Sequence, residues 1–306
     1  MNKALAVVFL LCSFNLFACL NGETKTLANG AVIYEDFEGI IPRGHRFNIS
    51  KFPQLLKELD SLYKKTKKIE YLSDKGYVLI LQGKYQEAIK LYLDIEKSHP
   101  NRYSTASNLG TAYELSGDNI NALKWISRGV SINPDSHDSS EWLHIKILEA
   151  KINTTKINSD FFIGTNFGNF DMPVSELSQI QTQKMILALY FQLNERISFI
   201  KSDDSIIALL LFELGNLSML ESEFSDANQI FKIAKEYGYE SNLLEKRISF
   251  TNGFLFAKKS TYSNETSYSY INYEKTILLI ISILIALIGL YFLIKKLRIL
   301  KKPSST

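Results

Sequence analysis

The sequence predicts an all-α fold in which pairs of helices stack into a solenoid, after a small N-terminal β segment and before one C-terminal transmembrane helix. Three observations predict it. Small residues and prolines recur at an interval of 34 residues. Apolar residues follow a helical period through most of residues 51–250. An uncharged apolar run of 18 residues, 277–294, lies near the C-terminus.

The 34-residue repeat is clearest in residues 69–152. Four positions keep their residue type in two successive units, namely Gly76 and Gly110, Gly83 and Gly117, Ala88 and Ala122, and Pro100 and Pro134. The first and third pairs are small where two antiparallel helices approach closely, and the second pair occupies a turn that needs a positive φ. The prolines end the second helix of each unit. Each unit is therefore predicted to be a helix, a turn and an antiparallel helix.

The motifs of these units resemble those of tetratricopeptide repeat (TPR) proteins of the bacterial membrane-anchored type. They read Gly76-Tyr77…Gly83-Lys84-Tyr85-Gln86-Glu87-Ala88-Ile89…His99-Pro100-Asn101 and Leu109-Gly110-Thr111-Ala112-Tyr113…Gly117-Asp118…Ala122…Asn133-Pro134. A third first helix follows at 139–152, with His144 in the slot of a small residue. The resemblance covers residues 69–250 and is strongest over the first two units. It implies a TPR-like helical-pair solenoid that binds a protein or peptide on its concave face.

Residues on either side of these units are assigned to further helices of the array. A capping helix is predicted at 51–68, and degenerate helical repeats are predicted at 175–250. Within the degenerate region, Gly215 and Ala227 keep the spacing of Gly76 and Ala88, and Ser222 replaces the turn glycine. Between the repeats at 69–152 and the degenerate repeats at 175–250, residues 153–174 form an aromatic insertion with four phenylalanines. It is interpreted either as a lid with buried rings or as an exposed recognition loop.

The N-terminal 50 residues contain a targeting signal and a short β segment. Residues 1–19 are predicted to be a signal peptide, and Cys19, at the end of a lipobox-like sequence, is a candidate for lipidation. Residues 20–50 are predicted to be β-rich, with a hairpin around Asn29-Gly30. The only other cysteine, Cys12, lies inside the signal, so the exported body has no internal disulfide.

The C-terminal end predicts how the protein is anchored. Residues 251–276 are assigned to a linker, 277–294 to a transmembrane helix and 295–306 to a basic cytoplasmic tail. Five basic residues follow the apolar run, namely Lys295, Lys296, Arg298, Lys301 and Lys302. Because basic clusters stay on the cytoplasmic side, a single-pass protein of the cell membrane is predicted, with its repeat domain periplasmic or otherwise extracytoplasmic.

The charge distribution disfavours nucleic acid as a partner. The net charge is +3, but the five basic residues of the tail and Lys3 supply six positive charges, which leaves the rest of the chain at −3. A slightly acidic body without a basic stripe does not attract phosphate backbones. The sequence also lacks the phosphate-loop, zinc-protease, nucleophile-elbow and Cys-x-x-Cys motifs, so no catalytic residue and no cofactor is predicted.

One histidine group provides an alternative reading as a metal-dependent hydrolase. His137, Glu141 and His144 have spacings of four and three, which would place them on one helix face within reach of a metal ion. However, His137 lies in a polar helix start and His144 in a packing slot. The two histidines are therefore expected to point to different surroundings, and no bound metal is predicted.

The resemblance implies which residues face a partner on the concave wall. These positions are Glu70, Ser73, Tyr77, Ser107, Thr111, Glu114, Asp138 and Glu141. They carry none of the Lys, Arg and Asn residues with which related proteins clamp a chaperone's C-terminal carboxylate. The sequence thus predicts a non-catalytic protein-interaction scaffold at the membrane. A second reading with the same fold is an envelope assembly or quality-control factor that binds several clients.

Overall fold

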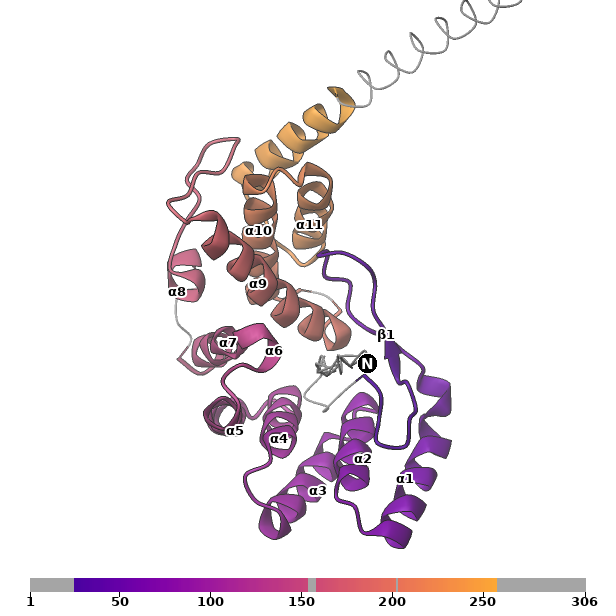
Figure 1. Ribbon diagram of the computed structural model, residues 1–306. Coiled ribbons are helices and arrows are strands. Elements are labelled where there is room, and N and C mark those ends of the chain that lie inside the picture. Colours follow the sequence, from indigo (N-terminus) through magenta and orange to yellow (C-terminus); the bar gives the residue numbers. More distant parts are fainter. Residues whose placement is uncertain (1–24, 154–157, 202, 258–306) are drawn as a thin grey trace, which may run out of the picture. The chain divides into compact units, whose positions relative to one another are not determined.

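The computed structural model describes residues 25–153, 158–201 and 203–257, and its compact units are 1–251 and 252–306 (Figure 1). All helices and strands with labels belong to the first unit. The predicted signal peptide with Cys19, the transmembrane helix and the basic tail lie outside the described residues. Within the described part of the chain, none of the helices combines the length and apolar character that a membrane crossing requires.

The N-terminal segment forms less β-structure than the sequence predicts. Strand β1 (Tyr34–Glu35) pairs antiparallel with β2 (Arg46–Phe47), with Tyr34 opposite Phe47. The predicted hairpin around Asn29-Gly30 is present in a short form: Gly30 has a φ of 84°, and the two arms pair through the antiparallel bridge between Thr26 and Val32. Leu27, Ile33 and Tyr34 pack against the helix that follows the short 3-10 turn η1 (Ile49–Lys51).

Five helices then follow one another as predicted, each packed on the next. They are α1 (Phe52–Thr66), α2 (Glu70–Leu81), α3 (Tyr85–Ser98), α4 (Tyr103–Leu115) and α5 (Asn119–Ile132). Helix α1 has a proline in its first turn and buries Leu55 and Leu59. It occupies the region predicted to be a capping helix, and it packs against α2.

The close approach within each helix pair recurs at the same place in three units. A Cβ atom added at Gly76 would lie 2.5 Å from the ring of Tyr92, and one added at Gly110 would lie 2.6 Å from Ile126. Helices α10 (Ser205–Leu220) and α11 (Phe224–Glu236) repeat this contact, because a Cβ on Gly215 would lie 2.4 Å from Phe231. Each partner comes 16 residues after its glycine. The pair α10–α11 is therefore a third unit of the same geometry.

The turns between paired helices are also equivalent. Gly83, Gly117 and Ser222 have φ values of 73°, 89° and 65°, each seven residues after the close-approach glycine. In every turn the amide of this residue donates to the carbonyl three residues before it. The turn position thus requires the left-handed conformation even where serine occupies it.

We expect Ser222→Gly to stabilise the protein by about 0.5–1 kcal/mol. A left-handed serine is strained by about 1–2 kcal/mol, and the greater freedom of glycine in the unfolded chain offsets only part of this strain. The measurement is the urea midpoint followed by tryptophan fluorescence. Gly83→Ser is the matched control: an added Cβ there meets nothing within 4 Å, so its backbone strain alone should destabilise the protein. Opposite signs for the two variants support the equivalence of the turns.

The third first helix, predicted at 139–152, is present at 141–153, and a separate short helix precedes it. Helix α6 (Ser136–Ser139) ends at Ser140, and α7 (Glu141–Asn153) starts anew. His137 and Ser139 have φ values of 52° and 60°, which are incompatible with a continuous right-handed helix. The group of His137, Glu141 and His144 therefore does not lie on a single helix.

The aromatic insertion is packed over the helices that follow it. After α8 (Ser159–Ile163), the chain reaches the long helix α9 (Gln179–Phe199), which starts in a capping box between Ser178 and Gln181. Phe162 and Phe167 are buried in the core cluster of α9, α10 and α11, and Phe161 packs against it, whereas Phe170 is 69% exposed. The interpretation as a lid with buried rings thus describes Phe162 and Phe167, whereas Phe161 is only partly buried.

The linker begins later than predicted. Residues 242–257 are helical, so 251–257, which were assigned to the linker, continue a helix. This helix buries Leu244 and Arg247 in the first unit. Thr251, the first residue assigned to the linker, is also fully buried, and its hydroxyl accepts from Asn228 at 2.7 Å, a packing partner that the polar composition did not indicate.

Candidate functional site

Helix α9 lies against first helices that are distant in the sequence. It packs on α6, α7 and α10, and its C-terminal Phe199 contacts the core clusters that α1 to α4 form. The ring of Phe199 lies 6.1 Å from that of Phe47. Helix α7 therefore lies against α9, and three residues of the predicted wall, Thr111, Glu114 and Glu141, line a cavity beside it.

A cavity of about 210 Å³ remains between α4, the α6–α7 corner and the last turns of α9. Its charged lining comes from all of these elements and includes Glu114, His137, Glu141, His144, Lys151 and Arg196. Most of these side chains are almost fully removed from solvent. The cavity is therefore a place where ionisable groups of both signs meet in a medium of low polarity.

Glu114 of α4 is the centre of the first charged group. Its carboxylate lies 2.7 Å from Nε2 of His144, 2.9 Å from Nζ of Lys151 and 3.5 Å from Nη2 of Arg196. Burial alone would raise the pKa of Glu114, but Arg196, His144 and Lys151 hold this pKa well below 4.5. Glu114 is thus an anion that ties α4 to both α7 and α9.

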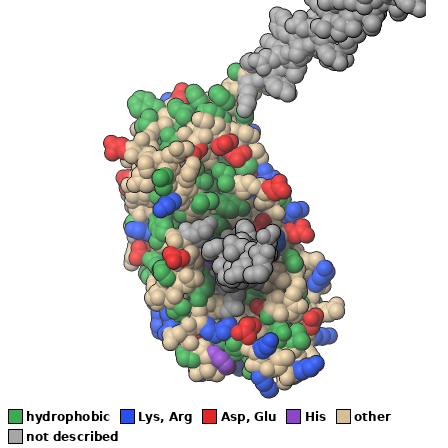
Figure 2. Space-filling view, in the orientation of Figure 1, with side chains coloured by type: hydrophobic (Ala, Val, Ile, Leu, Met, Phe, Trp, Pro, Cys, Tyr) green, Lys and Arg blue, Asp and Glu red, His purple; other side chains and the backbone are tan. Residues whose placement is uncertain are grey.

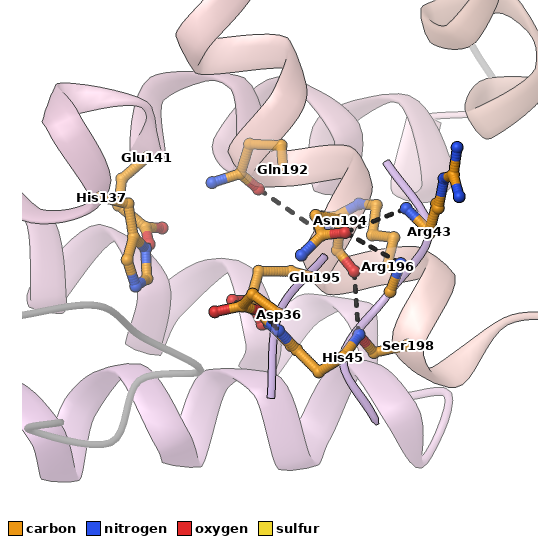
Figure 3. A network of polar contacts seen from close by, with 11 residues as sticks. Asp36, Arg43, His45, His137, Glu141, Gln192, Asn194, Glu195, Arg196 and Ser198 are labelled. Atoms are coloured by element: carbon orange, nitrogen blue, oxygen red, sulfur yellow. Dashed lines mark hydrogen bonds and ion pairs between the residues drawn. The ribbon is translucent and has the colours of Figure 1, made fainter. Parts of the chain in front are cut away.

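Glu141 at the start of α7 is the centre of the second group. It contacts Nδ1 of His137, and Figure 3 shows this pair facing the residues of α9. Nδ1 of His144 lies 3.3 Å from its other oxygen. Burial opposes ionisation, but the two histidines lower the pKa of Glu141 below 4.5. The pKa of His144 is raised above 6.5, because Glu114 and Glu141 outweigh its burial and the repulsion of Arg196.

These contacts correct the expectation that His137 and His144 point to different surroundings. Both histidines turn toward Glu141, and both ring nitrogens of His144 face carboxylates. Those nitrogens are therefore engaged by carboxylates instead of being directed at a common metal position. No group of three or more His, Cys, Asp or Glu side chains with an arrangement that could hold a metal occurs among the residues that the structure describes.

The N-terminal segment fixes the position of α9 from its other side (Figure 3). The amides of Arg43 and Gly44 donate to Oδ1 of Asn194 at 3.1 and 2.8 Å, and the amide of His45 donates to Oγ of Ser198 at 2.8 Å. Gly44 is required here, because its φ is 74° and an added Cβ would lie 3.0 Å from the backbone nitrogen of Ser198.

His45 completes this attachment by an ion-pair bridge. Its Nδ1 contacts Asp36, and its Nε2 lies 3.0 Å from Oε1 of Glu195 on α9. Its pKa is raised above 6.5, because Glu195 and Asp36 outweigh the effect of burial. Nothing in the sequence around His45 indicates the partner Glu195, which lies 150 residues away.

The predicted wall residues lie in different environments. Thr111, Glu114 and Glu141 line the cavity. Tyr77 is packed with Phe52 and Leu59, and Ser107 faces the position where a Cβ on Gly129 would be. Ser73 is buried, Glu70 pairs with Arg102 at 3.5 Å, and Asp138 belongs to α6. The structure tests none of these as partner contacts, so their binding role stays a prediction.

The repeated close contacts and turns of α2–α3, α4–α5 and α10–α11 define a TPR-like helical-repeat protein. No family model and no curated protein matches the chain. A solved structure that is similar to it is a tetratricopeptide repeat protein from Parabacteroides merdae. That protein is 17% identical, and the match covers 66% of this chain and 93% of that chain with a TM-score of 0.32. The class is defined here by the repeated geometry of the chain itself.

We expect the charged cavity to make stability depend on pH in a definite direction. The raised pKa of His144 contributes stability that is complete below 6.5 and is lost as the pH rises through its folded-state value. The lowered pKa values of Glu114 and Glu141 contribute stability above 4.5 that is lost in acid. Urea midpoints should therefore be highest between these values, and His144→Gln should reduce the alkaline fall, leaving the part that the raised pKa of His45 contributes.

His99→Gln is the matched control for this experiment. His99 is exposed at the end of α3, and its ring contacts only the neighbouring Ser98 in the contacts that the structure describes. Its variant should keep the wild-type profile. An alkaline fall of the same size in His144→Gln would mean that another group causes it.

Proposed function

We propose that this chain is a non-catalytic protein-interaction scaffold, anchored in the cell membrane through residues 277–294 with its repeat domain outside the cytoplasm. The observation that carries the proposal is the recurrence of one helix-pair geometry in three units. Arrays of such pairs present long surfaces built from successive helices, and they bind extended peptides or partner helices.

The part of the predicted wall best placed to meet a partner is at the start of α2. The side chain of Glu70 is 41% exposed, whereas Tyr77 and Ser107 are buried. In Figure 2, hydrophobic side chains gather where α9 to α11 lie, and many Lys and Arg side chains lie in the half formed by α1 to α5. A polar partner segment is therefore proposed for the α1–α5 half, where rim charges would set its orientation and rate of association.

The proposed membrane topology is supported by the apolar run and the basic cluster that follows it. We expect Ser263→Cys to react with a membrane-impermeant thiol reagent in intact cells or after the outer membrane is opened. Ser304→Cys should react only after lysis. The wild-type chain, which contains Cys12 and Cys19, gives the background labelling. The reverse pattern would place the repeat domain in the cytoplasm.

The scaffold role itself is tested by site-specific photo-crosslinking in cells. A photoreactive residue at position 70 should capture a defined protein, whereas one at Lys90, exposed on the second helix of the same pair, should not. One captured partner supports a dedicated scaffold, and several clients support the envelope quality-control reading. Equal capture from both positions would contradict binding through the first-helix face.

A further inference from the structure

The guanidinium of Arg196 is buried in the cavity with few partners. The residue is only 7% exposed. Nη1 donates a long hydrogen bond of 3.5 Å to Oε1 of Gln192. Nη2 forms an ion pair with Oε1 of Glu114, also at 3.5 Å. Within the described structure, Nε and Nη2 have no hydrogen-bond acceptor. A buried cation with unused donors is costly unless another group accepts from them.

Two carboxylates that line the same cavity have the opposite deficit. Oε2 of Glu141 and Oε2 of Glu195 are buried without a hydrogen-bond donor among the described residues. Glu141 still has the ion-pair contact of 3.3 Å with His144, and Glu195 uses its other oxygen for His45. The cavity therefore combines a guanidinium whose Nε has no acceptor with two carboxylate oxygens, of which that of Glu195 has no donor and that of Glu141 faces His144 at 3.3 Å.

The rest of the lining restricts the size and character of an occupant. Leu115, Phe199 and Ile200 supply an apolar part of the wall. A volume of about 210 Å³ corresponds to about seven water molecules at about 30 Å³ each. It is smaller than the pockets of about 300 Å³ and more that hold drug-sized ligands. An occupant must therefore be a small molecule with one apolar side.

We propose that this cavity is a binding site for a free α-amino acid with an aliphatic side chain. Its carboxylate would accept from Arg196, its ammonium group would donate to Glu141 and Glu195, and its side chain would contact Leu115, Phe199 and Ile200. A simple anion would be repelled by the carboxylates, and a simple cation by Arg196 and Lys151. A quaternary ammonium zwitterion has no N–H with which to satisfy the two carboxylates.

The test is calorimetric titration of the purified full-length chain with L-leucine. One molecule should bind per chain, whereas N-acetyl-L-leucine, which lacks the ammonium group, and L-leucinamide, which lacks the carboxylate, should each bind at least about tenfold more weakly. Glycine betaine should not bind. This comparison uses the unaltered protein, so it does not depend on whether a variant folds.

A variant pair then places the binding in the cavity. Arg196→Gln should weaken L-leucine binding by at least about tenfold. Arg128→Gln, which changes an arginine of α5 outside this cavity, should leave it unchanged. Near-ultraviolet circular dichroism shows whether each variant is folded.

Three results would overturn the proposal. They are the absence of saturable binding by any standard amino acid up to about 1 mM, equal binding of an analogue that lacks one of the two charges, and binding that a folded Arg196→Gln variant retains. Crosslinking from position 70 does not require a bound amino acid. If no amino acid binds the cavity, the scaffold proposal is therefore unaffected and is still tested by the crosslinking experiment.

Discussion

Arg247→Met is expected to destabilise the protein by about 3 kcal/mol, because it removes one buried donor group from several acceptors at once. Arg247 is fully buried. Its Nη2 donates to the carbonyls of Gly168 and Phe167 at 2.9 and 3.2 Å, and its Nη1 donates to Asn216. Methionine fills a similar volume but leaves these acceptors without a donor.

The same contacts give the prediction a local readout. Arg247 binds backbone carbonyls of the aromatic insertion, so its loss should release that segment before the rest of the unit unfolds. Hydrogen exchange in residues 164–172 should therefore accelerate more than exchange in α4 and α5. Arg43→Met, on an exposed arginine that contacts Gln229 at 3.0 Å, should change the urea midpoint little. Similar losses in both variants would mean that the buried contacts of Arg247 contribute no special stability.

Asn216 extends this attachment to α8. Its Nδ2 donates to Oε2 of Glu213 at 2.8 Å, and Glu213 also accepts from Ser159 in α8. Burial raises the pKa of Glu213 above 4.5, although Ser159, Asn216 and Arg247 act in the opposite direction. The aromatic insertion is therefore held by a polar network as well as by Phe162 and Phe167.

The helical pairs could be predicted from the sequence because their constraints are local. Gly76, Gly110 and Gly215 are each followed by an alanine 12 residues later, and this spacing is readable in the sequence because both positions belong to adjacent helices of one unit. The prediction that Ser222 replaces a turn glycine is confirmed by its positive φ. In both cases one local requirement of the backbone, a close helix approach or a positive φ, limits the residue type at one position. The sequence alone therefore shows where that position is.

The candidate site could not be predicted in the same way because its contacts are distant in sequence. Arg196 approaches Glu114, and Glu195 approaches His45, across separations that carry no periodic signal. The break at Ser140 also depends on left-handed residues that are neither glycine nor asparagine. The expectation that His137 and His144 point to different surroundings was wrong, because nothing in the sequence indicates that the carboxylate of Glu141 lies between them.

Gly110→Leu is expected to destabilise the protein by at least about 1–3 kcal/mol, since the added side chain must enter space that Ile126 already occupies. A Cβ alone would lie 2.6 Å from two side-chain atoms of Ile126 and 3.1 Å from its backbone nitrogen. The side chain of Ile126 can rotate, but the backbone nitrogen moves only if α5 shifts away from α4. Ala122→Phe should have a comparable effect, because Ala122 is fully buried in the cluster with Ile126 and Leu148.

Gly253→Leu is the matched control for this close approach. An ideal Cβ at Gly253 meets nothing within 4 Å, so the same substitution there adds no steric conflict and replaces glycine within a helix by a better helix former. Urea unfolding followed by tryptophan fluorescence measures all three variants. Trp125 lies in α5 and packs in the core cluster of the first two units, so separation of α4 and α5 should change its contribution to the emission, which it shares with Trp142. Unchanged midpoints for both Gly110→Leu and Ala122→Phe would show that the predicted repeat register, and with it the equivalence of the three helix pairs, is wrong.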